Sequence, residues 1–98
     1  MTKATPKYRM VVITADAVVS AVPTLLMAIL VNANNVDWEL QLTDDGDGNG
    51  VNVIEFAGQL EGGQTFFDLT NLNGVNFPLV GIYCDLTGAN HVTFWLDG

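Results

Sequence analysis

Apolar and polar residues alternate strictly in the segment Val36-Asp37-Trp38-Glu39-Leu40-Gln41-Leu42-Thr43. The alternation places Trp38, Leu40 and Leu42 on one side of an extended chain and polar side chains on the other. A period of two is the signature of a β-strand that buries one face and exposes the other. The segment therefore predicts a strand that packs against a core through one face.

Six further runs have the same extended character and follow one another at intervals of roughly ten residues. They cover residues 8–14, 24–31, 51–60, 65–69, 79–86 and 91–96. Turn-forming pairs such as Asn-Gly, Asp-Gly and Thr-Gly separate them, and no window combines an amphipathic helical period with capping residues. Residues 15–21 could form at most a single helical turn. The chain is predicted to be all-β, an antiparallel β-sandwich of jelly-roll-like arrangement with seven or eight short strands.

The chain is expected to have one domain with a short leading segment. Residues 1–7 have no apolar pattern and contain Pro6, which predicts a flexible basic N-terminal arm. Residues 8–98 are predicted to form a single β-sandwich domain, because no repeat or second domain is visible in them. The inward positions of the alternating runs supply the expected core. These residues are Val11, Ile13, Leu25, Ile29, Val31, Trp38, Leu40, Leu42, Ile54, Phe56, Phe67, Leu69, Ile82, Cys84, Val92 and Phe94.

The charges are separated along the chain. The only basic residues are Lys3, Lys7 and Arg9, all eleven carboxylates follow them, and the net charge is −8 with histidine neutral. Binding to nucleic acid requires lysine or arginine spread over a contact surface, so we expect no nucleic-acid partner. Copies of so acidic a chain repel one another, so self-association must come from apolar or hydrogen-bonded contacts. A cationic partner would be the natural complement.

Residues 17–31 are uncharged and mostly apolar, and they follow the basic residues in the manner of a signal peptide. Asp16 directly precedes this stretch, and Pro23 interrupts it. A membrane-spanning helix needs about 20 apolar residues, more than the stretch provides. We therefore expect a buried strand here and no membrane association.

The residue types that carry catalysis are scarce. Ser20 is the only serine, His91 the only histidine and Cys84 the only cysteine. Ser20 lacks the flanking glycines of a nucleophile elbow, and one histidine with one cysteine cannot build the usual transition-metal sites. Asp44 and Asp45 could serve glycoside hydrolysis only across a cleft, which a sandwich of this size rarely encloses. We expect no enzyme activity and no cofactor, and Cys84 is expected to be a buried strand residue.

Residues 45–50, Asp-Gly-Asp-Gly-Asn-Gly, match the first six positions of an EF-hand calcium loop. In that motif Asp45, Asp47 and Asn49 would bind the ion through their side-chain oxygens. The match then fails, because the twelfth position is Phe56 instead of a bidentate glutamate. Glycines that allow positive φ in a hairpin connection explain the same sequence. A hairpin turn is therefore expected, and no metal site.

Alternation in the last two runs assigns Tyr83 and Trp95 to the polar side, and Phe66 fits that side as well. Exposed aromatic side chains on a polar face mark protein interfaces, although each ring could instead be covered by its own loops. We expect these three rings to form an outer patch that binds another protein or a second copy, with the basic residues as further contacts. The expected partner-binding residues are Lys3, Lys7, Arg9, Phe66, Tyr83 and Trp95.

The second half of the chain contains a characteristic series of segments. They are the Asp/Gly/Asn loop at 44–50, the strand at 51–60 and the run Gly81-Ile82-Tyr83-Cys84-Asp85-Leu86-Thr87-Gly88-Ala89-Asn90-His91-Val92-Thr93-Phe94. This series resembles small all-β virion proteins of tailed bacteriophages, including cyanophages. In those proteins a glycine-hydrophobic-aromatic segment that ends in Thr-Gly-Ala leads into a short last strand. The similarity covers residues 44–96 best and consists of strand lengths and turn residues.

The resemblance implies a non-enzymatic structural role in a virion. The expected role is that of a capsid decoration or cement protein, or a head-fibre or tail-fibre module, which works as an oligomer. Its partner would be the major capsid protein or another virion protein, and a trimer is the expected oligomer. A basic arm before an acidic body agrees with this role, because arm and body can then meet different surfaces.

The alternative function is a carbohydrate-binding β-sandwich module, such as an adhesin or fibre domain. In such a module Trp38, Tyr83 or Trp95 would stack on sugar faces beside asparagine and aspartate side chains. Exposure of these rings together on one flat side would favour the alternative.

Overall fold

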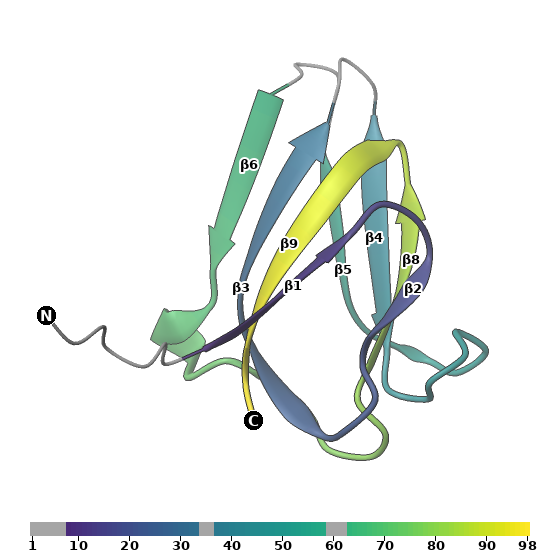
Figure 1. Cartoon of the computed structure of the whole chain (residues 1–98), viewed down its shortest axis with the longest axis vertical. Helices are drawn as coiled ribbons and strands as arrows, with labels where there is room; N and C mark the ends of the chain where they lie inside the picture. The colour runs from purple at the N-terminus through teal and green to yellow at the C-terminus, as the bar shows by residue number, and fades with distance from the viewer. Residues whose placement is uncertain (1–7, 34–36, 59–62) are drawn as a thin grey trace, which may run out of the picture.

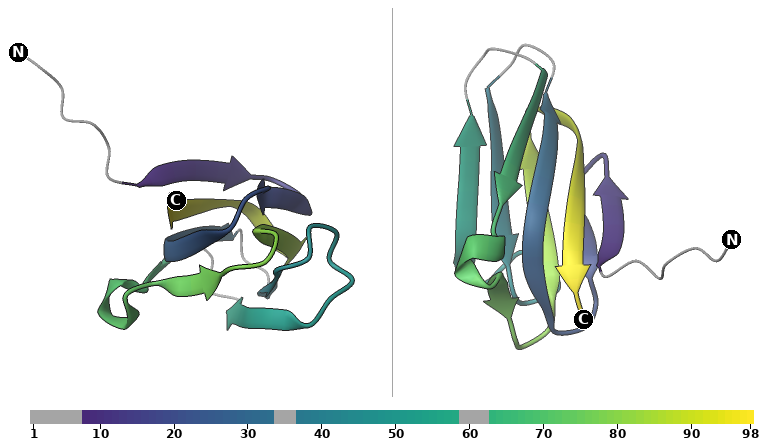
Figure 2. Two further views of the ribbon diagram at one scale, coloured as in Figure 1. Left: turned by 90° about the horizontal axis from the view of Figure 1, so that it is seen from below. Right: turned by 90° about the vertical axis from the view of Figure 1, so that its left-hand side faces the viewer.

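The computed structural model describes residues 8–33, 37–58 and 63–98. Within them the chain forms nine strands in two antiparallel sheets, packed face to face as a sandwich (Figures 1 and 2). The strands are β1 (Arg9–Ile13), β2 (Ala17–Ser20), β3 (Thr24–Ala33), β4 (Trp38–Thr43), β5 (Asn52–Gly58), β6 (Gly63–Asp68), β7 (Val75–Phe77), β8 (Ile82–Thr87) and β9 (Ala89–Asp97). The described residues contain no α-helix, only the three-residue 3₁₀ turn η1 (Thr70–Leu72). The predicted all-β sandwich is confirmed.

The strand order is that of a jelly roll. Sheet A has the order β1-β9-β3-β6, with β7 also paired to β3, and sheet B has the order β2-β8-β4-β5. Strands β6 and β7 pair with successive parts of β3, so together they act as one interrupted strand. On that count each sheet has four strands, and the β4–β5 hairpin is the one connection that stays within a sheet. This arrangement of two interleaved Greek keys confirms the jelly-roll-like topology.

Two of the nine strands were not predicted. Residues 15–21, considered for a helical turn, contain β2, which pairs with β8 through Ala17 opposite Cys84 and Val18 opposite Tyr83. Pairing to a distant strand decides the conformation of this segment, because its local sequence is ambiguous. Strand β7 has three residues, too few to show a period of two.

The basic arm expected at residues 1–7 lies outside the described residues, as do Val36 and Leu60.

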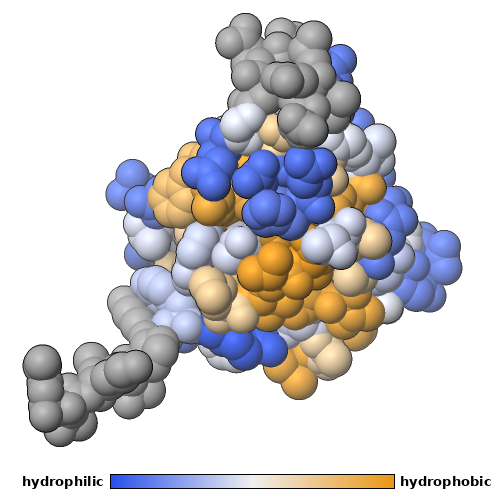
Figure 3. Space-filling model, turned by 45° about the horizontal axis from the view of Figure 1, so that its top comes forward, coloured by the Kyte–Doolittle hydropathy of each residue, from blue (hydrophilic) through white to orange (hydrophobic). Residues whose placement is uncertain are grey.

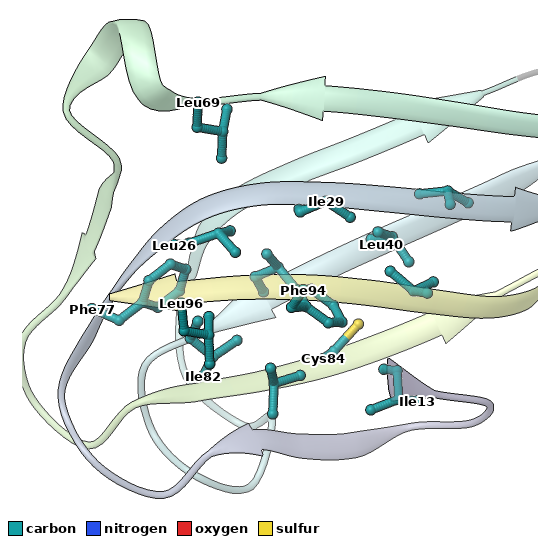
Figure 4. Close-up of a cluster of buried hydrophobic side chains, with 14 of the residues drawn as sticks. Ile13, Leu26, Ile29, Leu40, Leu69, Phe77, Ile82, Cys84, Phe94 and Leu96 are labelled. Atoms are coloured by element: carbon teal, nitrogen blue, oxygen red, sulfur yellow. The ribbon is translucent and has the colours of Figure 1, made fainter. Parts of the chain in front are cut away.

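The core lies between the two sheets (Figure 4). Most predicted core residues are buried there, and Val11, Ile54, Phe56 and Phe67 pack against it from half-buried positions. Leu26, Phe77 and Leu96 are fully buried although they were not predicted. Trp38 lies within this core, where its ring meets that of Phe67 edge to face at a centroid distance of 5.9 Å.

The prediction of Leu25 as a core residue is wrong. Leu25 is half-buried and lies opposite the exposed Asp97, while its neighbour Leu26 is fully buried opposite Leu96. The pairing of β3 with β9 shifts between Leu26 and Ala28, which marks a β-bulge. A bulge adds one residue and reverses the inward and outward positions on its far side. A simple alternation through residues 24–31 therefore assigns the wrong side chain to the core before the bulge and the correct ones, Ile29 and Val31, after it.

The two sheets leave two broad outer faces. The body measures 40 × 38 × 24 Å along its principal axes. Strand β1 lies at one surface of the sandwich and β5 at the opposite one, as Figure 2 shows from below. The outer face of sheet A and the outer face of sheet B therefore point in opposite directions.

Candidate interaction surface

The outer face of sheet A carries an apolar surface made of two rows of side chains. Residues directly opposite each other in paired strands share a face of the sheet. One row runs from Met10 through Trp95 to Ala28, and the other runs from Val12 through Thr93 and Leu30 to Phe66. We call these seven residues the apolar face. Figure 3 looks onto this side and shows apolar side chains gathered near its middle.

The apolar face is open to solvent at its margins. Met10 is 61% exposed, Val12 52% and Phe66 57%, whereas Ala28 at the centre is buried. The ring centroids of Phe66 and Trp95 are 6.0 Å apart and meet edge to face. Ala28 pairs directly with Trp95 and is too small to separate the two rings, which approach each other diagonally across β3. The structure therefore brings together two of the three aromatic residues predicted for a binding patch.

The third aromatic residue, Tyr83, does not join them, so the expected three-ring patch is wrong. Tyr83 belongs to β8 in sheet B and alternates with the inward-facing Ile82 and Cys84. A side chain added at Gly48 would overlap the Tyr83 ring, which shows that the β4–β5 loop lies against this ring. Desolvation raises the pKa of Tyr83, and the nearby carboxylate of Asp16 raises it further. The face-by-face alternation was correct for Tyr83, but it could not say which sheet the strand would join.

The outer face of sheet B is acidic. Asp85, Gln41 and Glu55 form one row across β8, β4 and β5, and Glu39 lies beside them with its carboxylate accepting a hydrogen bond from the Gln41 amide at 2.7 Å. The charge of Asp16, followed by desolvation, raises the pKa of Asp85. The two broad faces of the molecule therefore differ in kind, one apolar and one negatively charged.

The Asp/Gly/Asn segment forms the β4–β5 hairpin connection, as predicted. The carboxylate of Asp45 accepts hydrogen bonds from the Thr43 hydroxyl at 2.9 Å and from the backbone amides of Asp47 and Gly48 at 3.2 and 2.8 Å. Asp47 in turn accepts from the amide of Asn49 at 3.0 Å. These aspartate oxygens thus close the turn itself. No group of three or more histidine, cysteine, aspartate or glutamate side chains that could hold a metal ion occurs among the described residues.

A second apolar area lies beside this hairpin. A hollow of about 480 Å³ is lined by Val51, Val53, Pro78 and Leu79 together with the base of the loop. Val51 is 89% exposed, which makes it the most exposed large apolar side chain of the described residues. Asp44 ties the two walls of the hollow together, because its carboxylate accepts hydrogen bonds from the backbone amides of the β7–β8 connection.

The remaining candidate residues have structural contacts. The Arg9 guanidinium donates to the Ser20 hydroxyl at 2.8 Å and to the Gly98 carbonyl at 3.0 Å, so it links β1 to β2 and to the end of the chain. Cys84 is fully buried, as predicted, and burial raises the pKa of its thiol to about 12. His91 lies half-buried on β9 opposite Asn32. Lys3 and Lys7 lie outside the described residues.

Met10 and Val12 were missed as candidate surface residues. A signal for them exists in the sequence, because residues 10–13 are apolar on both sides of an alternating strand. A strand at the edge of a sandwich needs an apolar residue only on its inward side. Apolar residues on the outward side of β1 were therefore a signal for an apolar outer face.

Comparison of the chain with protein-family models finds no match, and comparisons with curated proteins and with solved structures find no significant match. Within the part of the chain that the structure describes, no helix is long and apolar enough to cross a membrane. The assignment of a function therefore depends on the fold and on the two outer faces.

Proposed function

We propose that this chain is a non-enzymatic structural protein of a bacteriophage virion, a capsid decoration or cement protein that binds the virion surface as an oligomer. The apolar face of sheet A is its assembly surface. The observation that carries the proposal is the edge-to-face contact between Phe66 and Trp95 on a face that also exposes Val12, in a chain of net charge −8.

The fold supports this proposal in a general way. Jelly rolls occur in viral capsid proteins, in lectins and in cupins, so the topology alone does not select a function. The apolar face adds the specific argument, because monomeric proteins rarely expose large contiguous apolar patches unless the patches bind something. Aromatic residues at the centre of such a face are the usual anchors of protein interfaces.

The placement of the aromatic rings weighs against the carbohydrate-binding alternative. Trp38 is buried in the core, Tyr83 lies on sheet B and Trp95 lies on sheet A. Sugar-binding platforms present rings together on one side, and here no two of these three share a surface.

The test is to ask whether the chain travels with virus particles. Particles from the native source would be separated on a density gradient, and the polypeptide would be sought by peptide mass spectrometry. We expect it in the particle fractions, in a constant ratio to the major capsid protein across the peak. Recovery only with free soluble protein would contradict the proposal.

A further inference from the structure

We propose that the partner covering the apolar face is a second copy of the same chain, bound face to face about a two-fold axis. This inference rests on the proposed function, since it names the occupant of the assembly surface. It also leaves the acidic outer faces of sheet B pointing away from each other, free to meet a cationic surface on the virion.

The distribution of charge selects this face for contact between copies. Two chains of net charge −8 repel each other, and the repulsion is strongest where carboxylates face one another at close range. On the outer face of sheet B, Glu39, Asp85 and Glu55 would meet their equivalents. The seven residues of the apolar face contain no charged group. Copies can therefore approach most closely through sheet A.

Two carboxylates adjoin the apolar face at its edges, and one of them, Asp68, lies directly opposite Ala28 and so continues the first row onto the edge strand β6. Asp68, at the end of β6, accepts hydrogen bonds from the Thr70 amide at 2.9 Å and from the Thr70 hydroxyl at 2.6 Å. Asp97 lies at the far end of β9, opposite Leu25. Charged groups at a rim remain hydrated when the centre of an interface is buried, so they oppose association only weakly.

A standard dimer interface takes only a modest share of the surface of this chain. A standard interface buries about 800 Å² on each partner, which is about one seventh of the 5799 Å² surface of this chain. A body of 40 × 38 × 24 Å has its largest surfaces on its two broad sides. The contact between Phe66 and Trp95 joins a ring on the edge strand β6 to one on the inner strand β9, and aromatic side chains are the usual anchors of interfaces.

The geometry favours a two-fold dimer over the trimer expected from the resemblance. A two-fold interface uses the same patch on both copies, whereas a cyclic trimer needs two different patches that complement each other. The charge argument leaves one broad face for contact between copies. The apolar face can pair with the same face of a second copy, which fits a dimer.

The first experiment is sedimentation equilibrium on the full chain over a wide range of concentrations, with the variant Val12→Glu and the matched control Val51→Glu. Both valines are exposed, and both substitutions add one carboxylate, but Val51 lies beside the hairpin hollow. We expect the natural chain and Val51→Glu to dimerise. Val12→Glu should weaken dimerisation by at least about 100-fold, because like charges would be buried against each other.

Circular dichroism melting of each variant shows whether it folds. Because Val12 is half exposed, its replacement should leave the fold intact. If Val12→Glu fails to fold, Phe66→Ser is the second variant with which to test the same face. The proposal is overturned if the natural chain is monomeric at all concentrations, if it forms a trimer, or if Val51→Glu dissociates as readily as Val12→Glu.

Tryptophan fluorescence provides an independent readout of the same face. Trp38 is buried in the monomer, so a change in emission on association must come from the half-buried Trp95. We expect a shift of the emission to shorter wavelength as the concentration rises, and no shift in Trp95→Phe. A concentration-dependent shift that persists in Trp95→Phe would contradict the proposed surface.

These measurements use purified protein and need no virus particle. A dimer formed through sheet A that is absent from particles would refute the proposed function and retain the dimer. A chain that is found in particles but is monomeric in solution would refute the dimer and retain the proposed function.

Discussion

Asp44 shows how a single carboxylate can connect two loops that are distant in sequence. Its two oxygens accept hydrogen bonds from the backbone amides of Leu79, Val80 and Gly81 at 2.7 to 2.8 Å. Desolvation alone would raise the pKa of Asp44, but the three backbone hydrogen bonds outweigh it and the pKa lies below its ordinary value. The ionised side chain therefore stabilises the connection between β7 and β8.

We predict that Asp44→Asn lowers the free energy of unfolding at neutral pH by about 1–2 kcal/mol, because charge-assisted hydrogen bonds are lost at a half-buried site. The pKa of Asp44 is lower in the folded state, so its contribution is present above the unfolded pKa near 4 and is lost as pH falls through the folded pKa. Urea denaturation at several pH values would measure this. The difference from the natural chain should vanish in acid.

The control for this experiment is Asp47→Asn, in the same loop. Asp47 accepts one hydrogen bond, from Asn49, and does not reach the β7–β8 connection. Its replacement should therefore change stability much less. Equal losses for the two variants would mean that the loop responds to charge alone and not to the link made by Asp44.

The pKa of Asp85 is shifted in the opposite direction to that of Asp44. Its pKa is raised, first by the charge of Asp16, so in the folded state its ionisation is unfavourable. Stability then decreases as pH rises through the pKa of Asp85. We predict that Asp85→Asn raises Tm by about 2–4 °C at pH 7 and has no effect in acid, where Asp85 is protonated. Thermal melting would measure it, with Glu55→Gln as a control on the same face, far from Asp16 in the sequence.

At the level of elements, β3 organises sheet A. It pairs with β9 on one edge and with β6 and β7 on the other, so three of the other four strands of the sheet pair with it and only β1 does not. Its bulge near Leu26 changes which residues face the core. The first residues of β3 therefore bury Leu26, and the later ones bury Ile29 and Val31. The position of this bulge is fixed by pairing to β9, which local sequence does not reveal.

The turn before β8 depends on Gly81. Its φ is 135°, and a Cβ at this position would lie 2.1 Å from the carbonyl oxygen of Ser20. We predict that Gly81→Ala destabilises the fold by about 3 kcal/mol or more, because backbone strain adds to a backbone clash. Chemical denaturation would measure the loss. Gly63→Ala is the control, since Gly63 also has positive φ but no atom within 4 Å of the added Cβ, and it should cost about 1–2 kcal/mol.

At the scale of the whole molecule, the separation of apolar and acidic faces has a consequence for salt dependence. If copies associate through the apolar face, the main electrostatic term is the repulsion between their acidic bodies. The Debye length falls from about 30 Å at 0.01 M to about 8 Å at 0.15 M ionic strength. We predict that added salt in this range lowers the dimer Kd several-fold, measured by sedimentation equilibrium. Weakening by salt would show that the copies are instead held by opposite charges.

Much of the fold could be predicted from local pattern. The alternation in residues 36–43 gave β4 with its buried face correctly, and the spacing of turn residues indicated a jelly-roll-like sandwich. The hairpin at residues 44–51 followed from its glycines and aspartates. These features depend on the period of two and on turn preferences, which act between residues close in sequence.

The pairing of distant strands decided the rest. Alternation shows that Tyr83, Phe66 and Trp95 face outward from their strands, but not that β8 belongs to sheet B while β6 and β9 flank β3 in sheet A. The same pairing turned β2 into a strand and set the bulge in β3. The sequence by itself thus determined which side of each strand is apolar. Only the tertiary structure decided which outward sides meet to form one surface, because a side chain's neighbours across a sheet come from segments far away in the chain.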